Sequence, residues 1–561
     1  MNTQAPAESL PLQRLYHWEK TAPDRVALTQ PTGGGATRDY TWREVMDQAR
    51  RMAAHLLSLG IQAGDRVALI SKNTAHWMMS DYAIWLAGGV SVPLYPTLAP
   101  GTIRQILEHS EAKLLFVGKL DGWANMLPGV PDGLPCIAHP LAPDEARAAY
   151  PSWDDIVGKT APLQGQPVRD GSELSTIMYT SGTTGAPKGV MHCFGSFAMA
   201  VKTGLTRVPM TEQSRMLSYL PLSHVVERTL VEHGQLNSGM RVYFAESLDT
   251  FAADMQRARP TIFFSVPRLW VKFQHIVHGK MPSAKLNRML KIPILGGVVR
   301  RKIIGGLGLD QSEFAAGGAA PMPIDLLRWY ARLGLKVREG YGMTENLGAT
   351  HLSSGEPATF GTVGPAYPDV ECRIDPANGE ILVRCAWTML GYYKEPELTR
   401  QVLTADGWLK TGDKGTLDAA GNLKITGRVK DLFKTSKGKY VAPAPIEDKL
   451  VMHDAIEACC VTGANLGQPL ALVMLNPEAN TQAAGRAELE ASLAAHLKAV
   501  NDTLDPHEKL DCLVVTAEAW TVDNDLITPT FKVKRNRIED LFAKNYDAWV
   551  GTRKKVIWFK A

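Results

Sequence analysis

The apolar run LSTIMY (174–179) leads into the loop YTSGTTGAPKG (179–189). The loop contains three glycines, three threonines, one serine and one lysine, and almost nothing that could fill a hydrophobic core. Backbone N–H groups and hydroxyls in such a loop can point at an anion, and glycine lets the backbone approach that anion closely. We expect a buried strand before the loop and a helix at 195–204 after it. A glycine-rich loop in that position is typical of a phosphate site.

Lys188 adds a mobile positive charge to this loop. It follows Pro187 and precedes Gly189, so the Walker A pattern, in which lysine follows glycine and precedes serine or threonine, does not fit. An ordinary P-loop ATPase or kinase is therefore disfavoured. A flexible surface turn is the plain alternative, because loops rich in Gly, Ser and Thr are common.

Outside the loop, apolar runs of strand length alternate with segments of helical periodicity. Thr41 and Glu44 form a capping-box pattern that opens an amphipathic helix ended by Gly60. Further along, strands are expected at 65–71, 91–96, 113–118 and 261–267, and helices at 76–88 and 101–112. Such alternation predicts a parallel sheet with helices on both faces.

The pattern changes near Val363. Antiparallel strands are expected at 381–385 and 422–428, and after residue 429 short strands alternate with helices. The chain has 561 residues, which is more than one hydrophobic core usually organises. We therefore expect an N-terminal domain at 1–428 and a C-terminal domain at 429–561.

Composition excludes several classes of protein. Lys plus Arg number 61 and Asp plus Glu 57, and no nucleic-acid-binding signature occurs, which argues against a nucleic-acid partner. The seven cysteines include no C-x-x-C pair and predict free, buried thiols in a reducing compartment. The N-terminus has no secretory signal pattern, and the apolar window 76–95 is broken by Asp81 and Pro93. We expect a cytoplasmic protein without a membrane span.

Six further motifs follow the loop along the chain. They are LPLSHVVER (220–228), AAGGAAP (315–321), REGYGMTE (338–345), GWLKTGD (407–413), GRVKDLFKTSKGKYVAP (427–443) and LITPTFKVKR (526–535). Together with YTSGTTGAPKG they closely resemble the signature motifs of the adenylate-forming superfamily, in the same order. That superfamily includes acyl-CoA synthetases, the adenylation domains of peptide synthetases and firefly luciferase. The resemblance runs from roughly residue 15 to residue 543.

The resemblance implies an α/β fold in two parts. A large N-terminal domain of parallel-type sheets sandwiched by helices, with a small β-barrel-like part, would hold the ATP and acyl sites. A smaller, mobile α+β C-terminal domain would carry the catalytic lysine.

The resemblance also implies a two-step reaction that uses ATP, Mg2+ and coenzyme A. A carboxylate attacks the α-phosphorus of ATP, which gives an acyl-adenylate and pyrophosphate. The thiol of coenzyme A then attacks the acyl carbonyl and releases AMP. Because the first step brings two anions together, it needs positive charge and a metal aimed at the transferring phosphoryl group.

Several positions match the superfamily's ATP-binding residues. They are Thr180, Ser181, Gly182, Thr183, Thr184, Lys188, Gly318, Ala319, Ala320, Gly340, Tyr341, Gly342, Thr344, Asp413 and Arg428. By this match Tyr341 would stack on adenine, Thr344 would bond the α-phosphate, and Asp413 would accept hydrogen bonds from the ribose hydroxyls. Arg428 would bind ribose or phosphate. Glu345 and Thr184 would hold Mg2+, which usually keeps several waters.

The resemblance implies catalytic roles for Lys532, His224, Thr184 and Glu345. Lys532 aligns with the late lysine that bridges the carboxylate and the α-phosphate, although many members carry glycine where this chain has Phe531. Lys534 and Arg535 are alternative candidates for this role. A run of basic residues is usually a solvated face, so the run itself does not select one of them. His224 would position the acyl carboxylate and would not act as a base, since a carboxylate nucleophile needs no deprotonation.

Three more positions match residues that act after adenylation. Lys430 matches the hinge about which the small domain rotates. Lys437 and Gly438 would then bind coenzyme A, with Gly438 letting the pantetheine arm pass close to the backbone.

The substrate stays open at this stage. LPLSHVVER and TPTFKVKR (528–535) resemble the long-chain branch and favour a long fatty acid. A medium-chain or aryl acid, transfer of the adenylate to a carrier protein, and a luciferase-like oxygenase are alternatives within the family. An inactive ATP- or lipid-binding homologue is the alternative outside enzymes, and the retained cluster of charged motif residues argues against it.

The segment 280–307 contains seven basic residues and no acidic one among its apolar residues. It could lie on an anionic membrane surface, as a peripheral contact at the inner face of a membrane. An ordinary helix and loop packed on the protein is the alternative. The basic, aromatic tail 549–561 is equally ambiguous, and a homodimer stays open.

Overall fold

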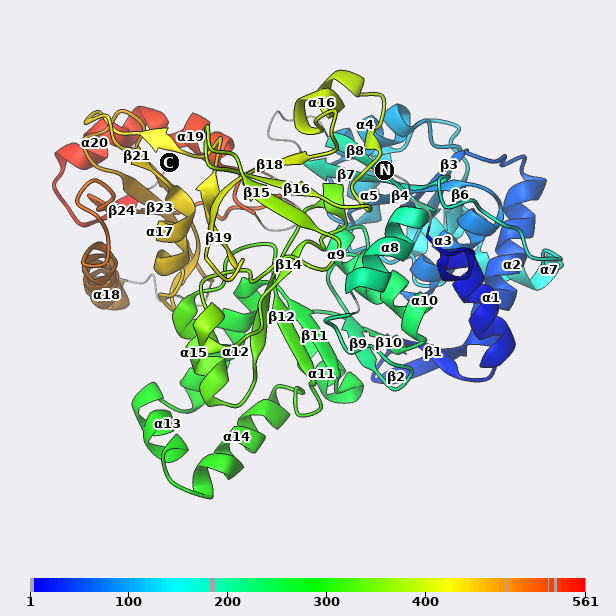
Figure 1. The fold of residues 1–561 in the computed structure, drawn as a ribbon, viewed down its shortest axis with the longest axis horizontal. Helices are drawn as coiled ribbons and strands as arrows, with labels where there is room; N and C mark the ends of the chain where they lie inside the picture. The colour runs from blue at the N-terminus through cyan, green and yellow to red at the C-terminus, as the bar shows by residue number, and fades with distance from the viewer. Residues whose placement is uncertain are drawn as a thin grey trace.

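The computed structural model describes residues 5–181, 187–204, 206–477, 479, 483–522, 524–528 and 532–559, without the side chains at 181, 483 and 484. Figure 1 shows the N-terminal elements, in blue and cyan, at one end of the molecule. The orange and red C-terminal elements lie at the opposite end. The mixed α/β architecture expected from the sequence is confirmed.

A seven-stranded sheet in the order β17-β8-β7-β4-β3-β5-β6 organises the first part of the chain. Its strands are β3 (Arg66–Ile70), β4 (Val90–Leu94), β5 (Leu114–Val117), β6 (Cys136–Ala138), β7 (Leu174–Ser181), β8 (Pro187–Cys193) and β17 (Gly391–Tyr392). The strands from β7 to β6 are parallel, whereas β17, β8 and β7 pair antiparallel. The predicted parallel sheet is present, with an antiparallel edge.

Two four-stranded sheets continue this part of the molecule, in the orders β2-β1-β10-β9 and β11-β12-β13-β14. The first contains β1 (Val26–Gly33), β2 (Ala36–Thr41), β9 (Arg215–Ser218) and β10 (Arg241–Phe244). The second contains β11 (Ile262–Ser265), β12 (Phe314–Gly317), β13 (Val337–Tyr341) and β14 (His351–Leu352). Because β11, β12 and β13 are parallel, their carboxyl ends meet at one edge, where ligands commonly bind.

Three further sheets are formed by later parts of the described chain. An antiparallel sheet comprises β15 (Glu371–Ile374), β16 (Glu380–Arg384), β18 (Leu409–Leu417) and β19 (Leu423–Arg428). After it come the pair β20 (Phe433–Lys434) and β21 (Tyr440–Val441), and a sheet of β22 (Ile456–Thr462), β23 (Leu470–Leu475), β24 (Leu513–Thr516) and β25 (Val556–Phe559). The antiparallel strands expected at 381–385 and 422–428 correspond to β16 and β19.

Helices cover these sheets. In the first half they are α1 (Pro11–Thr21), α2 (Trp42–Ser58), α3 (Ala75–Leu86), α4 (Pro100–Ser110), α5 (Trp123–Met126), α6 (Asp144–Ala149), α7 (Trp153–Lys159), α8 (Phe194–Gly204), α9 (Val225–Glu227) and α10 (Gly234–Ser238). Further along the chain they are α11 (Phe251–Ala258), α12 (Pro267–Lys280), α13 (Ser283–Leu290), α14 (Leu295–Gly306), α15 (Ile324–Arg332), α16 (Pro396–Val402), α17 (Pro443–Leu450), α18 (Ala483–Asn501), α19 (Arg535–Phe542) and α20 (Tyr546–Gly551). The capping box predicted at Thr41 and Glu44 opens α2, with both reciprocal hydrogen bonds present.

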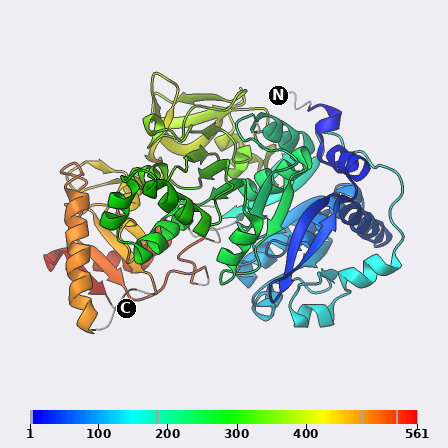
Figure 2. The same ribbon diagram turned by 90° about the horizontal axis from the view of Figure 1, so that it is seen from below.

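Helix α12 lies beside the C-terminal elements, which Figure 2 shows in orange and red next to green helices. Two contacts join them. Arg268 of α12 pairs with Glu457 of β22. His275 of α12 lies 2.9 Å from Asp454, measured between Nε2 and Oδ1. The C-terminal elements are thus held against the larger part of the molecule in this structure.

The strand–loop–helix arrangement predicted around residues 179–189 is wrong. The strand β8 intervenes before helix α8, and it pairs antiparallel with β7 so that Thr180 faces Lys188. The chain that follows the loop therefore enters a strand paired with β7 and not a helix N-terminus. The apolar sequence of β8 was the missed signal, because Val190, Met191 and Cys193 extend the hydrophobic pattern past the glycines.

The C-terminal tail also has a structural place. Residues 556–559 form β25, which pairs parallel with β24 at the edge of the C-terminal sheet. The ring of Phe559 packs against Trp549, with centroids 5.0 Å apart. The aromatic residues of this tail thus pack on their own domain, which explains their clustering without a membrane.

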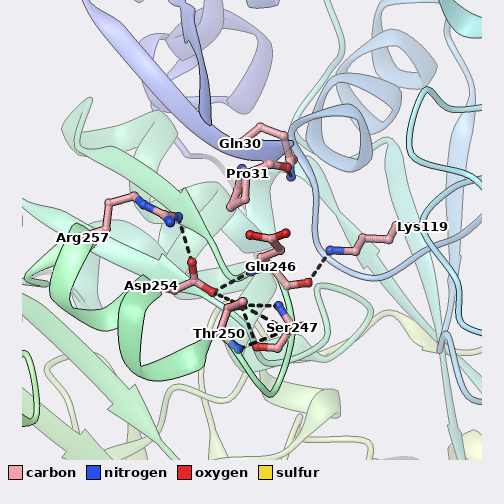
Figure 3. Close-up of polar contacts among 8 residues, drawn as sticks. All are labelled: Gln30, Pro31, Lys119, Glu246, Ser247, Thr250, Asp254 and Arg257. Carbon is pink, nitrogen blue, oxygen red and sulfur yellow. Dashed lines mark hydrogen bonds and ion pairs between the residues drawn. The ribbon is translucent and has the colours of Figure 1, made fainter. Parts of the chain in front are cut away.

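A polar cluster joins two of the sheets (Figure 3). The buried carboxylate of Asp254 accepts hydrogen bonds from the Glu246 amide at 2.8 Å, the Thr250 hydroxyl at 2.9 Å and the Arg257 guanidinium at 2.8 Å. Lys119, just after β5, donates to the carbonyl of Glu246, just after β10. We assign this cluster a structural role, because the hydrogen bonds to Asp254 hold the turn before α11 in place.

All seven cysteines are free, and six of them are buried, as predicted. No helix in the described residues has the length and apolar character needed to cross a bilayer.

Candidate active site

A large cleft of about 2300 Å³ contains most of the predicted residues that the structure describes. Its wall is built from the carboxyl ends of β12 and β13, from the hairpin β7–β8, from β18 and β19, and from the chain around residue 532. Segments far apart in sequence thus meet at one place.

Thr180 and Lys188 stand opposite each other at the end of the β7–β8 hairpin and line the cleft. Ser181 is the last residue of β7. Burial, followed by repulsion from Lys430, lowers the pKa of Lys188, and attraction from Glu345 partly offsets this. The predictions for Gly182, Thr183 and Thr184 fall outside the described residues.

Small residues after β12 and β13 keep the backbone accessible. A Cβ on Gly318 would lie 2.9 Å from the Phe264 ring and 3.0 Å from the Gly340 carbonyl, so no larger residue fits there without movement. Ala319 has a φ of 69°, a left-handed conformation that is uncommon outside glycine, and Ala320 follows it in the cleft wall. A Cβ on Gly342 would lie 2.3 Å from the Gly348 backbone. These close approaches fix the shape of the cleft floor.

Tyr341, Asp413 and Arg428 form one hydrogen-bonded group. The Tyr341 hydroxyl donates to Asp413 Oδ2 at 2.7 Å, and Arg428 Nε lies 3.1 Å from Asp413 Oδ1. Asp413 and Arg428 are register partners on β18 and β19. Both oxygens of the carboxylate are thereby held, and the Tyr341 ring lines the cleft.

Glu345 is a buried carboxylate at the wall of the cleft. Its Oε1 accepts a hydrogen bond from the Tyr392 hydroxyl at 2.7 Å. Burial raises the pKa of Glu345, and the Tyr392 bond and the charge of Lys188 work in the opposite direction. The Lys188 ammonium lies 5.8 Å from the centre of the Tyr392 ring. Neighbouring Thr344 presents its carbonyl to His192 Nε2 at 2.7 Å, which fixes this turn.

Lys532 comes from the C-terminal segment and enters the same cleft. The side chain of Lys532 is exposed to the solvent that fills the cleft. The surrounding cleft walls nevertheless remove part of the water around its ammonium group. This desolvation, followed by repulsion from Arg428, lowers the pKa of Lys532 to about 8, while Asp413 and Glu345 attract its charge. Burial, followed by repulsion from Lys532, lowers the pKa of His224 to about 4, so the imidazole is neutral at physiological pH.

The two competing cations near Lys532 also line the cleft, but each is held in an ion pair. Lys534 pairs with Asp525, and Arg535 Nη2 lies 2.7 Å from Glu447. Both carboxylates belong to the C-terminal segment. Within this basic run, Lys532 is the residue whose charge lowers the pKa of His224 in the larger part.

The predicted hinge and coenzyme A residues are separated in this structure. Lys430 lines the cleft directly after β19. Lys437 and Gly438 lie in the turn between β20 and β21, where Lys437 Nζ is 3.5 Å from Gln468 Oε1, and neither is among the described residues of the cleft wall.

Tyr392 was missed by sequence reasoning. It lies in β17, beside the hairpin strand β8, and its hydroxyl orients Glu345. No spacing in the sequence connects Tyr392 to Glu345, because only the pairing of β17 with β8 brings them together.

Comparison with known proteins identifies the chain. A family model described as "AMP-binding enzyme" matches residues 15–393, and one described as "AMP-binding enzyme C-terminal domain" matches residues 430–550. The chain belongs to the AMP-binding enzyme family. Its similarity to the adenylate-forming superfamily, expected from the motifs, is thereby confirmed.

Named relatives of this family member extend over nearly its whole length. It is 30% identical to the long-chain-fatty-acid–CoA ligase FadD15 of Mycobacterium tuberculosis, over 95% of this chain and 96% of that one. It is 29% identical to the peroxisomal long chain acyl-CoA synthetase 7 of Arabidopsis thaliana, over 94% of this chain and 84% of that one.

Solved structures with the same fold are more distant in sequence. The A domain of the carboxylic acid reductase from Segniliparus rugosus, in complex with AMP and a carboxylic acid, has a TM-score of 0.80 at 22% identity, with coverage of 97% and 94%. The anthranilate CoA ligase AuaEII, in complex with anthranoyl-AMP, has a TM-score of 0.78 at 21% identity, with coverage of 98% and 100%.

Proposed function

We propose that this AMP-binding enzyme activates a fatty acid with ATP and then transfers the acyl group to coenzyme A. In the first step a carboxylate oxygen of the acid bonds to the α-phosphorus, the bond to the β-phosphate breaks, and pyrophosphate leaves. In the second step the sulfur of coenzyme A bonds to the acyl carbon, the bond to AMP breaks, and the thiol proton passes to solvent.

One observation carries this proposal. Lys532, from the C-terminal segment, shares a cleft with Glu345, Asp413, Arg428 and His224 of the larger part. A cation held between a candidate nucleotide site and a neutral histidine is suited to an acid and a phosphate that must react while both are negatively charged.

We assign the binding roles from these positions. Asp413, held by Tyr341 and Arg428, would accept the ribose hydroxyls, and the Tyr341 ring would lie against adenine. Thr180, Lys188 and the loop between them would hold the β- and γ-phosphates. Lys532 would bridge the acid and the α-phosphate, and neutral His224 would orient the acid without repelling Lys532.

A Mg2+ ion fits Glu345 by the chemistry of the donor. Within the described part of the chain there is no cluster of three or more His, Cys, Asp or Glu side chains that could hold a metal alone. An ion at Glu345 would therefore take its remaining ligands from phosphate oxygens and water, as Mg2+ commonly does. When bound, it would neutralise phosphate charge, while Tyr392 keeps the carboxylate in place.

Apolar residues in the wall of the cleft support a long acyl chain as the substrate. Ala200, Val201 and Gly204 of α8 line it together with Leu230 and Phe264. The full-length relatives named as long-chain ligases support the same substrate class. Transfer to a carrier protein and activation of an aryl acid are the competing functions, and acyl length and acceptor distinguish them.

We propose a boundary after Arg428, with residues 1–428 holding the nucleotide and acyl sites and residues 429–561 supplying Lys532. Lys430 would act as the hinge. Rotation there would withdraw Lys532 and bring Lys437 and Gly438 to the acyl-adenylate for the second step. We also propose a cytoplasmic enzyme that reaches its lipid substrate by peripheral contact with a membrane.

Pyrophosphate release with ATP, Mg2+ and fatty acids of graded length, with and without coenzyme A, tests this function. Turnover that requires coenzyme A and is greatest with long chains is expected. One stoichiometric burst that coenzyme A does not change would favour the carrier-protein alternative. No release with any acid would contradict an active ligase.

A further inference from the structure

We propose that the hairpin of helices α13 and α14 docks the enzyme on the surface of an anionic phospholipid membrane. This inference rests on the proposed use of a lipid substrate. The hairpin projects from the body of the molecule at the end of α12 (Figure 1).

The inner face of the hairpin already has a packing partner. Leu286 of α13 and Val299 of α14 are buried in a core that includes Phe273 of α12 and Trp329 and Tyr330 of α15. These contacts hold the hairpin to the protein. Ile292, Ile294, Leu295 and Val298 on its outer side lie outside this core.

The tip of the hairpin exposes a contiguous run of apolar side chains. Ile294 is 89% exposed and Val298 is 53% exposed, and Ile292 and Leu295 beside them are also exposed. Ile294 has a φ of 66°, an unusual conformation for a β-branched residue. Isolated exposed apolar residues are common, but several adjoining ones mark a contact surface.

The charge around this tip selects the partner. Lys285, Arg288, Lys291, Arg300, Arg301 and Lys302 are all exposed. Nearby Arg259 and Arg328 pair with Asp310 and Asp325, whereas none of these six pairs with a carboxylate in the described part of the chain. Unneutralised cations that flank exposed isoleucines match an anionic headgroup layer over an apolar interior.

The mode of contact is interfacial. No described helix is suited to span a bilayer, and α14 is short and ends in glycines. We infer that Ile294 and Val298 enter the boundary between headgroups and acyl chains while the cations stay among the headgroups. The hairpin packs on α15, which also contributes Ile324 and Arg328 to the cleft wall.

The test is cosedimentation of the full-length protein with vesicles of phosphatidylcholine alone or mixed with phosphatidylglycerol. Binding to the mixed vesicles is expected to be stronger by about tenfold or more and to fall with added salt. Ile294→Asp/Val298→Asp and, separately, Arg301→Glu/Lys302→Glu are each expected to weaken it by about tenfold or more.

Matched controls separate a docking surface from a general effect of charge. Leu59→Asp/Val168→Asp places two aspartates at other exposed apolar positions, which are 51% and 70% exposed. Lys509→Glu/Lys554→Glu makes the same change of net charge on exposed lysines of the C-terminal part. Both controls are expected to bind as the unchanged protein does.

Equal binding by the hairpin variants and the controls would overturn the proposal. So would a hairpin-dependent increase in mass without vesicles, which would make the surface a contact between copies of the chain. Acyl-CoA formation from a fatty acid carried on albumin is measured in parallel. If the unchanged protein formed no acyl-CoA, the proposed function would be contradicted. The vesicle experiment would still decide whether the hairpin is a docking surface.

Discussion

The Tyr341 hydroxyl donates a hydrogen bond of 2.7 Å to Asp413, across a cleft wall that joins residues 72 positions apart in the chain. Arg428 holds the other carboxylate oxygen. Because Asp413 is thereby oriented before any nucleotide binds, we expect Asp413→Asn to raise the KM for ATP by about 10- to 100-fold, the range for hydrogen bonds to a charged group. The KM for the fatty acid should change little.

Tyr341→Phe is the matched variant, since it keeps the ring and removes only the hydroxyl. A smaller rise in the KM for ATP is expected from steady-state kinetics. An equal rise in the KM values for both substrates in either variant would mean that the group supports the whole cleft and does not bind the nucleotide.

The pair of Glu345 and Tyr392 predicts a dependence on Mg2+. Glu345→Gln removes the charge and should raise the Mg2+ concentration required for half-maximal rate by more than Tyr392→Phe, which removes only the orienting hydroxyl. About a tenfold effect is expected for the second variant, as for other residues that orient a metal ligand. Titration of the rate with Mg2+ at saturating ATP measures both. Unchanged Mg2+ dependence in Glu345→Gln would place the metal elsewhere.

Gly204 predicts the control of chain length. Among the described residues, and apart from its own helix and chain neighbours, no atom lies within 4 Å of a Cβ placed on Gly204, which lines the cleft at the end of α8. Gly204→Phe should fill the cleft at this position and shift the preferred acid to a chain shorter by a few carbons, because each excluded methylene forfeits about 0.8 kcal/mol. Gly204→Ala is the control. Competition among acids of graded length measures this preference. An unchanged preference in Gly204→Phe would place the acyl chain in another part of the cleft.

Glu339 predicts a pH-dependent stability. It is buried on β13, where its carboxylate accepts the Met322 amide at 3.1 Å, and burial raises its pKa from 4.5 to about 7. A raised pKa in the folded state stabilises the protein below pH 4.5, and this stabilisation is lost as the pH rises toward 7.

Glu339→Gln lacks that titration. The stability of the variant relative to the unchanged protein should therefore increase as the pH rises through this range, by up to about 3 kcal/mol in free energy of unfolding. Thermal melts of both proteins across the range measure the difference. A difference that is constant with pH would mean that Glu339 is already ionised when folded.

Much of the fold could be predicted from local sequence. Hydrophobic periodicity located α2, β3, β4 and β11, and the capping pattern at Thr41 marked where α2 begins. The hairpin β7–β8 was not predicted, because a glycine-rich loop separates its two strands in the sequence. The edge strand β25 was missed because it lies in a basic, aromatic tail that also suits an exposed surface segment.

The candidate site divides in the same way. Lys188, Glu345, Asp413 and Arg428 were identified by motif, since each lies in a distinctive stretch of sequence. Tyr392 has no such motif, and its role depends on a strand pairing. Lys532 was chosen over Lys534 by its match to the late lysine of the superfamily, and the ion pair of Lys534 with Asp525 is consistent with that choice.

The most direct test of the account is the effect of Lys532→Ala on each half-reaction, with Lys534→Ala as the control. We expect Lys532→Ala to slow adenylate formation by about 100-fold or more, the loss typical when a charge-stabilising group is removed, while thioester formation from supplied acyl-adenylate stays nearly unchanged. Lys534→Ala should spare adenylate formation. Equal loss of both half-reactions in Lys532→Ala, or a larger loss of adenylate formation in Lys534→Ala, would contradict the assignment.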